Sequence, residues 1–415
     1  MRWMQTTMGE VCLPTVQIDP TRKGTGSFRY IDIAGIDREQ KTIFCADPIP
    51  CESAPSRARK LVQARDVLVS TVRPNLNAVA LVPEELDGEI ASTGFSVLRA
   101  NPKLVNPHYL FYRVQHQEFV AFLVANATGA SYPAVTDGVV RRAQLPLPSL
   151  NEQHHIVQIL DEADRLRRLH READAKAARI LPALFLKMFG DPATNPMGFP
   201  VKPLGHEDIC EINPRARLNM LDEETVSFVP MADVDEKVGR IVGKQTRTYG
   251  EVKKGFTPFK EGDVLFAKIT PCMQNGKAAI ASGLIEGIGF GSTEFHVLRA
   301  GRVVTPEFLF AIVRLQSFRN QAISTFTGTV GQQRVPAEFL KQYRLPVPPK
   351  AEVLKFSRLL REIISTQIEL EATAYKLDSQ FSLLLQRAFS GQLTAKWRKA
   401  HSNELLAEME QQARL

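Results

Sequence analysis

The same residue pattern occurs twice in this chain, and this duplication limits what the chain can fold into. Residues 66–68 read Asp-Val-Leu, and so do residues 263–265, at an offset of 263 − 66 = 197. Residues 97–100 read Val-Leu-Arg-Ala and recur at residues 297–300, at an offset of 297 − 97 = 200. Solenoid and propeller repeats have periods of roughly 20 to 50 residues. An offset near 200 therefore predicts two duplicated domains, which would make two similar contacts.

Two further matches keep the same order along the chain. Thr128 and the glycine after it match Thr327 and the glycine after it. The Leu-Pro-Leu-Pro of residues 145–148 matches the Leu-Pro-Val-Pro of residues 345–348. Chance supplies one shared segment but not an ordered series, so the duplication extends over each globular copy.

The composition is that of a globular protein with ordinary cores. A chain of 415 residues, 44% of them hydrophobic and 23% charged, is long enough for two or three domains. The apolar stretch at residues 119–127 is too short to span a bilayer, and residues 1–7 lack the apolar core of a signal peptide. We therefore expect a cytoplasmic protein.

Neither the charge nor the titratable residues identify a site by themselves. The formal net charge of +7 favours a polyanionic partner only slightly, because many proteins that bind no polyanion are as basic. The five cysteines form no Cys-x-x-Cys pair, which predicts reduced, partly buried thiols; Cys12 and Cys210 stand at the same position of the two copies. The eight histidines show no metal-ligand spacing, so no metal site is predicted.

Each copy reads as mixed α and β structure. The β-favouring runs of the first copy, separated by Gly, Pro and Asn, are residues 28–33, 67–71, 78–82 and 95–99. A helix to about residue 126 follows, with Asn106 as its N-cap and Pro107 at its first position. The second copy repeats this start with Thr305 and Pro306. The same order of elements is therefore predicted twice.

A long helix is predicted after each Leu-Pro-x-Pro segment. Ser149 and Glu152 are spaced as in a capping box, and the helical pattern continues to about residue 189. Its seam positions step by three and four and include one polar residue: Ile156, Ile159, Ala163, Leu166, His170, Ala173, Ala177, Ile180 and Leu184. The distal helix has the same steps: Val353, Phe356, Leu360, Ile363, Gln367, Leu370, Ala374, Leu377, Phe381, Leu384 and Ala388. Both patterns are typical of heptad seams.

The two seams can face each other if the helices pack antiparallel with His170 opposite Gln367. We hypothesise that this buried polar pair sets the register of the helices, since a polar residue at one seam position penalises slipped alignments. The alternative is that both side chains are solvated at the edge of the seam. Pro182 should kink the first helix or start a new turn. The facing apolar pairs at the two ends would be Ile156 with Phe381 and Leu184 with Val353.

The sequence thus predicts an α+β protein, with two duplicated mixed α/β domains separated by two long helices that form an antiparallel coiled coil. A helix of roughly 40 residues is on the order of 60 Å long, so the helices would set the spacing of the domains. The predicted segments are a first domain at 1–148, a central helix at 149–190, a second domain at 195–348, a distal helix at 349–391 and a C-terminal tail at 392–415.

Three segments carry a resemblance to a known family. Residues 145–161 read Leu-Pro-Leu-Pro-Ser-Leu-Asn-Glu-Gln-His-His-Ile-Val-Gln-Ile-Leu-Asp. Residues 188–196 read Met-Phe-Gly-Asp-Pro-Ala-Thr-Asn-Pro, and residues 387–394 read Arg-Ala-Phe-Ser-Gly-Gln-Leu-Thr. Together with the duplication, these segments resemble the specificity subunits of type I restriction-modification systems over almost the entire chain.

The resemblance implies that each domain is a target-recognition domain for one half of a split, asymmetric DNA sequence. The helices would set the gap between half-sites and dock two adenine methyltransferase subunits. The resemblance also implies that this chain is not an enzyme and binds no cofactor: S-adenosylmethionine, ATP and Mg would belong to partner subunits, which include a restriction and translocase subunit. The second junction, residues 345–350, lacks the pair formed by Glu152 and Gln153, so equal docking at both ends is not implied.

The candidate DNA-binding residues are of types that contact phosphates or base edges, and they lie in expected loops. In the first copy they are Arg73, Asn75, Asn77, Ser131 and Tyr132. In the second copy they are Lys268, Thr270, Gln274, Asn275, Lys277, Thr329, Gln332, Gln333 and Arg334. The basic residues expected at phosphates are Arg57, Arg59, Lys60, Lys253 and Lys254. For each residue the alternative is a solvated surface side chain.

Three motifs suggest catalysis but fit better as local structure. Residues 106–109, Asn-Pro-His-Tyr, resemble the Asn-Pro-Pro-Tyr signature of base-flipping methyltransferases, yet no glycine-rich loop accompanies them. Residues 235–237, Asp-Glu-Lys, fit half of a metal-dependent nuclease site but lack an upstream Pro-Asp, so we expect a solvated turn. Gly276 and Lys277 are followed by Ala278 and not by Ser or Thr, which excludes a P-loop. The remaining rival function is a two-domain coiled-coil scaffold that holds proteins and not DNA.

Overall fold

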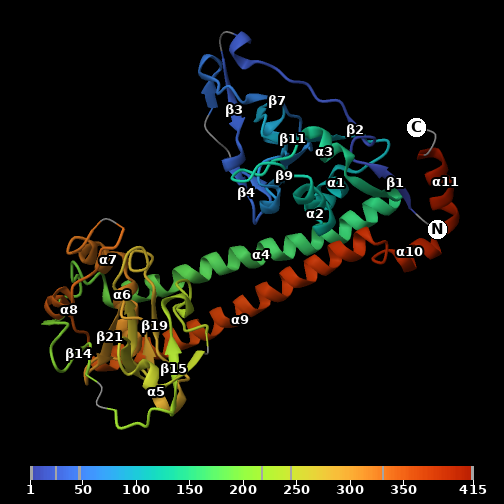
Figure 1. Ribbon diagram of the computed structural model, residues 1–415. Coiled ribbons are helices and arrows are strands. Elements are labelled where there is room, and N and C mark those ends of the chain that lie inside the picture. Colours follow the sequence, from blue (N-terminus) through green and yellow to red (C-terminus); the bar gives the residue numbers. More distant parts are fainter. Residues whose placement is uncertain are drawn as a thin grey trace. The chain divides into compact units, whose positions relative to one another are not determined.

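A computed structural model describes residues 3–23, 26–44, 48–215, 218–243, 245–329 and 331–412 of the chain. The chain forms two compact units (Figure 1). The first unit consists of Met1–Leu169 together with Ala374–Leu415, and the second consists of His170–Thr373. Each unit therefore contains one of the predicted globular copies and parts of both predicted long helices.

Within its described residues, the first unit is built on two four-stranded sheets. One is antiparallel, in the order β2 (Cys12–Leu13), β11 (Phe95–Ala100), β8 (Val67–Ser70) and β9 (Val79–Leu81). The other has the order β6 (Pro48–Pro50), β3 (Ser27–Ile31), β10 (Ile90–Ser92) and β7 (Ala58–Leu61), and its β3 and β10 are parallel. Two smaller pairs are β1 (Met4–Thr7) with β12 (Gln144–Leu147), and β4 (Ile36–Asp37) with β5 (Thr42–Ile43).

The predicted helix after Asn106 is two helices. The side chain of Asn106 accepts from the backbone N–H of His108 at 2.8 Å and caps α1 (Pro107–Arg113), as predicted. The chain then leaves the helix, and the His116 ring caps α2 (Gln117–Ala125) by accepting from the backbone N–H of Glu118. A third helix, α3 (Asp137–Arg142), precedes β12. The prediction of one helix to residue 126 was wrong because a cap in mid-sequence restarts it.

The second unit repeats this topology, which confirms the duplication. Its antiparallel sheet has the order β14 (Cys210–Ile212), β21 (Phe295–Ala300), β18 (Val264–Ala267) and β19 (Ala278–Ile280). Its other large sheet has the order β16 (Gln245–Thr248), β15 (Thr225–Val229), β20 (Ile288–Gly291) and β17 (Thr257–Lys260), with β15 and β20 parallel. The remaining elements are β13 (Val201–Pro203), β22 (Arg344–Pro346), α5 (Tyr249–Val252), α6 (Pro306–Arg314), α7 (Gln316–Ile323) and α8 (Ala337–Gln342).

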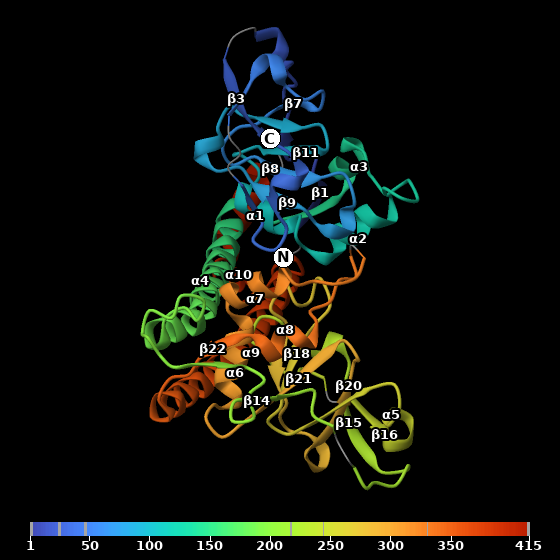
Figure 2. The same ribbon diagram turned by 90° about the vertical axis from the view of Figure 1, so that its left-hand side faces the viewer.

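One sheet of the second unit lies between the helices and the other sheet (Figure 2). On β18, Val264 and Phe266 belong to the core that contains residues of α6 and of the helix after residue 349. Leu265 points to the other face and packs in a separate core with Phe259 of β17. The first unit has the same layers, because Val67 of β8 packs on the helical side and Leu68 on the other.

Two of the repeated residues pair with each other. Asp66 accepts two hydrogen bonds from the Arg99 guanidinium, at 2.9 and 2.7 Å, and its side chain is 2% exposed. Asp263 and Arg299 make the same bonds in the second unit, at 2.8 and 2.7 Å. Both pairs join the end of one strand to its neighbour, so the repeated Asp and Arg are part of the scaffold.

The cysteines also follow the duplication. Cys12 lies opposite Ala100, and Cys210 lies opposite Ala300 in the equivalent strand pair. Burial raises the pKa of both thiols to about 12. They are free, as are Cys51 and Cys272, while Cys45 lies outside the described residues.

The two long helices are α4 (Leu150–Phe189) and α9 (Lys350–Phe389), each of 40 residues. In the first unit Ile156 of α4 shares a core with Phe381 of α9. In the second unit Leu184 packs against the core that contains Val353. The start of α4 thus packs with the end of α9 and the end of α4 with the start of α9, as an antiparallel pair. α4 continues through Pro182.

The seam predicted for α4 is wrong at Leu166, Ala173 and Ile180, which are exposed. Leu166 and Ile180 are 45% and 49% exposed. The next residues in the chain, Arg167 and Leu181, point inward. Arg167 lies 4.2 Å from the centre of the Phe381 ring and donates to Asp378 of α9 at 2.7 Å. A long side chain can bury its aliphatic part while its charged end forms an ion pair. Arg167 can therefore occupy a seam position, which a pattern of apolar residues does not predict.

His170 and Gln367 each reach a backbone carbonyl of the other helix, within the second unit. The Nε2 of His170 lies 2.9 Å from the Leu370 carbonyl oxygen, and the Gln367 amide donates to the Ala177 carbonyl oxygen at 3.2 Å. Both side chains are partly buried. Their role in setting the register stays a prediction.

The predicted capping box at the start of α4 forms only in part. The Ser149 hydroxyl accepts from the backbone N–H of Glu152 at 3.3 Å, but the fully buried Glu152 carboxylate does not return to the cap. It accepts instead from Trp3, Thr394 and Arg398, at 3.0, 2.6 and 2.6 Å. The chain after α9 continues as α10 (Ala395–Ala400) and α11 (Ser402–Gln412). In the described parts of the chain, no helix is long and apolar enough to cross a membrane.

Candidate nucleic-acid interface

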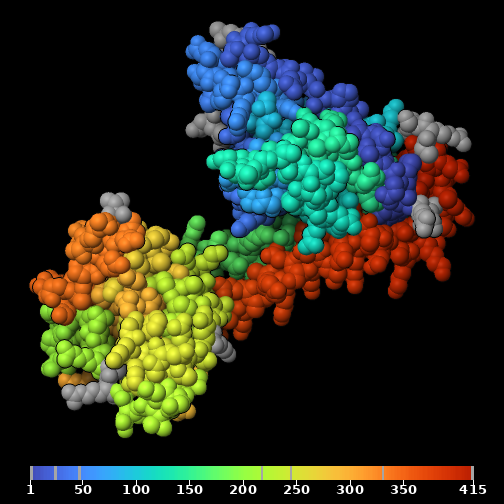
Figure 3. Space-filling view, in the orientation of Figure 1, coloured from blue at the N-terminus to red at the C-terminus, as the bar shows by residue number. Residues whose placement is uncertain are grey.

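The two predicted recognition loops of the first unit lie side by side. One follows β8 and the other follows α2. The backbone N–H of Arg73 donates to the Pro133 carbonyl at 2.7 Å, and Val72 forms an isolated bridge with Ala134. The Arg73 guanidinium lies 4.8 Å from the centre of the Tyr132 ring. Tyr132 is 69% exposed, so this cation–π pair presents a donor group and an aromatic face to solvent. Figure 3 shows α2 and α3, in blue-green, on an exposed face of this unit.

Residues 73–77 form a short turn fixed at both ends. Arg73 and Asn77 have φ values of +49° and +44° and flank a 3-10 turn, Pro74–Leu76. The Asn77 side chain donates to the Val114 carbonyl at 3.1 Å, and the backbone carbonyl of Asn77 accepts from the Lys41 ammonium group at 2.6 Å. Asn77 is therefore an anchor of the loop. Arg73, Asn75 and Ser131 are exposed.

Lys41 contacts the loop after β8, and the sequence did not indicate this contact. It lies in the hairpin of β4 and β5, and burial lowers the pKa of its amine to about 8. Its bond to Asn77 crosses from the hairpin to the loop after β8. Lys41 is a charged residue beside a hairpin turn, and nothing in the sequence predicts its contact with Asn77, 36 positions away.

The second unit brings its two predicted loops together in the same way. The backbone N–H of Thr270 donates to the Gln333 carbonyl at 3.0 Å, which is the counterpart of the bond between Arg73 and Pro133. Ile269 forms an isolated bridge with Arg334, as Val72 does with Ala134 in the first unit. The backbone frame is therefore common to both units.

The side chains on this frame differ between the units. Arg334 makes a bidentate pair with Glu294 at 2.9 and 2.8 Å, and its hydrogen bonds lower the pKa of the Glu294 carboxyl. The counterpart of Glu294 in the first copy is Gly94 (294 − 94 = 200), and that of Arg334 is Ala134. Gln332 and Thr329 are exposed, whereas Gln333 and Lys268 are half-buried. Subtracting the offset shows that Glu294 and Arg334 differ between the copies, but it does not show that they pair.

The loop after β18 is tied to its surroundings at several points. Lys277 donates to the Met231 carbonyl at 3.2 Å, and the exposed Asn275 donates to Glu236 at 3.4 Å. Gln274 is exposed, and its carbonyl accepts from Arg319 at 2.7 Å. Asp235 accepts from the backbone of Val238, so the Asp-Glu-Lys motif is a turn.

The basic residues expected at phosphates fall into two groups. Arg57 and Lys254 are exposed. Arg59 pairs with Asp19 at 3.5 Å, and Lys253 pairs with Asp222 at 2.7 Å. Lys60 is only 5% exposed and pairs with Asp137, the first residue of α3. The prediction of a phosphate contact is therefore corrected for Lys60, because its ammonium group already has a carboxylate partner and little surface.

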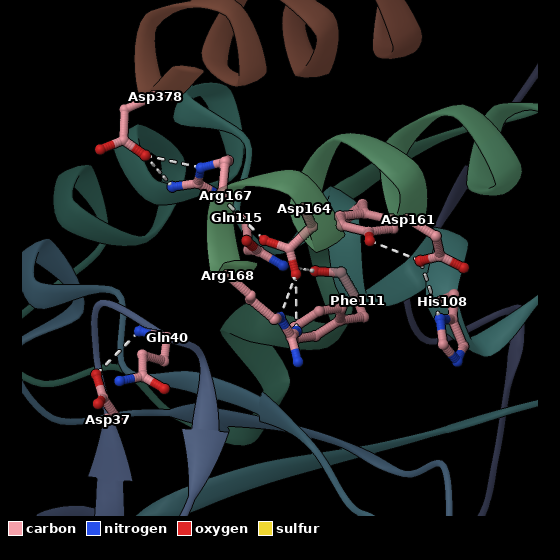
Figure 4. Close-up of polar contacts among 11 residues, drawn as sticks. Asp37, Gln40, His108, Phe111, Gln115, Asp161, Asp164, Arg167, Arg168 and Asp378 are labelled. Carbon is pink, nitrogen blue, oxygen red and sulfur yellow. Dashed lines mark hydrogen bonds and ion pairs between the residues drawn. The ribbon is translucent and has the colours of Figure 1, made fainter. Parts of the chain in front are cut away.

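The segment that resembles a methyltransferase signature connects the first domain to α4 (Figure 4). Tyr109 is fully buried and donates to the Pro146 carbonyl at 2.7 Å. Asp161 accepts from Tyr112 at 2.6 Å and lies 3.4 Å from His108. Burial opposes ionisation of Asp161, but the hydrogen bonds from His108 and Tyr112 lower the pKa of its carboxyl overall. These contacts give the segment a structural role.

Known proteins share this arrangement. Residues 54–177 and 201–376 match the family described as type I restriction modification DNA specificity domain. The specificity subunit of the type I restriction enzyme EcoEI from Escherichia coli is 37% identical over 158 residues, which are 37% of this chain and 26% of that protein. This chain therefore spans about a quarter of the length of that curated relative.

Two solved structures have the same fold. One, solved to explain complex assembly and conformational transition of a type I R-M system, is 26% identical with a TM-score of 0.58 and covers 94% of this chain and 98% of its own. The S subunit of a type I restriction-modification system from M. genitalium is 13% identical with a TM-score of 0.51 and covers 94% and 96%. Because the family match covers more than half of the residues, the chain belongs to the type I restriction-modification DNA specificity family.

Proposed function

We propose that this chain is the DNA sequence-recognition subunit of a type I restriction-modification complex. Each unit would read one half of a bipartite duplex target through the paired loops after β8 and α2, or after β18 and α7. The observation that carries this proposal is the common backbone frame with different side chains: Arg73 on Tyr132 in one unit, and Arg334 on Glu294 in the other. Base edges are read by such donors and acceptors, so different side chains imply two different half-sites.

The partners in this proposal supply the chemistry. The helices α4 and α9 would dock adenine methyltransferase subunits, which bind S-adenosylmethionine. A restriction and translocase subunit would bring ATP and Mg. The chain itself would be non-catalytic, bind no cofactor and act in the cytoplasm with its DNA.

The rival proposal is a scaffold of two interaction domains that binds proteins and no DNA. The two proposals differ in their dependence on salt, because neutralising DNA phosphates releases counterions and makes affinity fall steeply with ionic strength. A scaffold that buries apolar surface against proteins has no such dependence.

The decisive experiment is to express the chain with its methyltransferase and to map methylated adenines in the host DNA. A split motif with two unlike halves and a fixed gap is expected. Tyr132→Ala should relax the base specificity in one half of the motif, and Arg334→Ala should relax it in the other half. Each variant therefore serves as the control for the other. Absence of any methylated motif, together with no DNA protection at low salt by the purified complex, would favour the scaffold.

A further inference from the structure

The second unit encloses a cavity of about 140 Å³ that two arginines share. Its lining includes Leu181 of α4 and Ile364 of α9. Arg314, at the end of α6, and Arg319, in α7, also line it. The cavity is several times the volume of about 30 Å³ that one water molecule occupies in the liquid.

All hydrogen-bond acceptors of these two guanidinium groups are neutral. Arg314 donates to the backbone carbonyls of Glu236 and Lys237, at 2.9 and 2.7 Å. Arg319 donates to the Gln274 carbonyl and to the side-chain amide oxygen of Gln316, both at 2.7 Å. Within the described residues neither arginine forms an ion pair with a carboxylate. The two guanidinium groups therefore line one cavity, as does Lys237, and neither is in contact with a counter-charge among the described residues.

Each guanidinium also has a buried nitrogen without a partner, Nη1 in Arg314 and Nε in Arg319. Buried N–H groups of charged side chains are rarely left unpaired, because losing water without a replacement is costly. Burial and the neighbouring charge of Arg319 lower the pKa of Arg314 to about 10, although Asp235 and Glu236 act in the opposite direction. The Glu236 carboxylate is engaged by Asn275.

Two glycines allow the guanidinium groups to lie where they do. A Cβ atom on Gly239 would lie 2.4 Å from Nη1 of Arg314, and one on Gly276 would lie 2.9 Å from Nη1 of Arg319. Both glycines have positive φ, +78° and +74°. Gly276 and Lys277 do not form a P-loop motif. The lack of a side chain at Gly276 instead lets the Arg319 guanidinium lie close to the backbone.

This arrangement is specific to the second copy. Pro107 and Thr128 correspond to Pro306 and Thr327 at an offset of 199, so the counterparts in the first copy are Gln115 (314 − 199) and Val120 (319 − 199), both uncharged. The duplicated scaffold therefore does not require arginines at these places.

We propose that Arg314 and Arg319 form a binding site for one phosphate-type oxyanion. The planar guanidinium forks match tetrahedral oxyanions, and two positive charges match a dianion. Bound there, the anion would face both guanidinium groups, which line the cavity. Because Arg319 also holds the Gln274 carbonyl, occupancy would fix the loop after β18 from its inner side. The site needs no DNA to exist, so it can be tested independently of the proposed function.

The first test is binding of inorganic phosphate to the full chain by calorimetry, at constant ionic strength set with chloride. One phosphate per chain is expected, with at least a tenfold loss of affinity in Arg319→Gln. Arg314→Lys is the second variant, because it keeps a positive charge while losing the fork, and it should also lose affinity. The control is Arg302→Gln in the same unit, whose exposed arginine pairs with Asp208 and should bind phosphate as the natural chain does. Circular dichroism checks that each variant is folded.

The second test distinguishes a free ion from a phosphate of the DNA backbone. If phosphate competes with DNA in the natural chain but not in Arg319→Gln, the site takes a backbone phosphate. If phosphate binds the natural chain in the first test but leaves DNA affinity unchanged or raises it, the site holds a resident ion. Either result supports the oxyanion site. If phosphate neither binds the natural chain in a saturable way nor affects it differently from the Arg319→Gln variant, the proposal is wrong.

Discussion

The Glu152 carboxylate accepts a hydrogen bond from Nε of Arg398 at 2.6 Å, across 246 positions of sequence. Glu152 is fully buried, and Trp3 and Thr394 donate to the same carboxylate. The Arg398 guanidinium also lies 4.8 Å from the centre of the Trp3 ring. One side chain thus joins the start of α4, the first strand region and the segment after α9 within the first unit.

Replacing this carboxylate should loosen the C-terminal segment. Glu152→Gln leaves the Arg398 charge without its partner, and breaking a buried ion pair costs about 3–5 kcal/mol. Hydrogen exchange of α10 and β1 should therefore speed up in this variant. The matched control is Glu352→Gln, the exposed residue at the same offset in the second junction (352 − 152 = 200), which should change stability by less than about 0.5 kcal/mol. Equal effects of the two changes would contradict the role given to Glu152.

The repeated pairs of Asp66 with Arg99 and Asp263 with Arg299 should act locally. Each aspartate side chain is 2% exposed, so Asp66→Asn and Asp263→Asn should each destabilise their own unit by about 3 kcal/mol. Hydrogen exchange resolved by peptide should show faster exchange in β8 and β11 for the first variant. It should show the same in β18 and β21 for the second. A global change in either case would contradict two independently folded scaffolds.

The paired loops predict two separable losses of sequence discrimination. Arg334→Ala should cost about 1–3 kcal/mol of discrimination at bases of one half-site, because a bidentate donor is lost. Tyr132→Ala should affect the other half-site, through loss of the surface that supports Arg73. The measurement is binding of the complex to duplexes with single base changes. Uniform weakening on all duplexes would make Arg334 a phosphate contact.

Two buried histidines should make the protein less stable in mild acid. Burial lowers the pKa of His116 in the first unit and of His296 in the second below the ordinary value of 6.5. The unfolded chain then binds more protons than the folded one, so stability falls as the pH drops below 6.5 towards the lower folded pKa values. Urea unfolding at pH 7.5 and 5 should show this fall. The loss of unfolding free energy between these pH values should be smaller in His296→Gln than in the natural chain. In the exposed control, His154→Gln, the loss should equal that of the natural chain. A stability independent of pH over this range would contradict the shifts.

The sequence predicted the scaffold well because the scaffold is repeated. Residue patterns predicted four strands of the first copy, the caps of α1 and α6 and the two long helices, and the structure confirms each of them. The offset of about 200 extended this order of elements to the second copy. Asp66 and Arg99 were visible as repeated residues, but their pairing was not, because only the fold brings the two strands together.

The misses have a common physical cause, which is that polar side chains can be buried when partnered. Arg167, and not Leu166, points into the seam, because it forms an ion pair with Asp378 and a cation–π contact with the Phe381 ring. Lys60 was expected at a phosphate but pairs with Asp137. Glu152 was expected to complete a capping box, but its carboxylate pairs with Arg398. Such partners are distant in sequence, so periodicity and composition do not reveal them.

The division of the chain into units has a consequence for synthesis on the ribosome. The second unit is continuous, His170–Thr373, and can fold as soon as it emerges. The first unit begins the chain but is completed only by Ala374–Leu415, 374 − 169 = 205 residues after its first part ends. At roughly 5–20 residues per second, Arg398 is synthesised on the order of 10 to 50 s after Glu152, its partner. The domain translated first is thus the domain that finishes last.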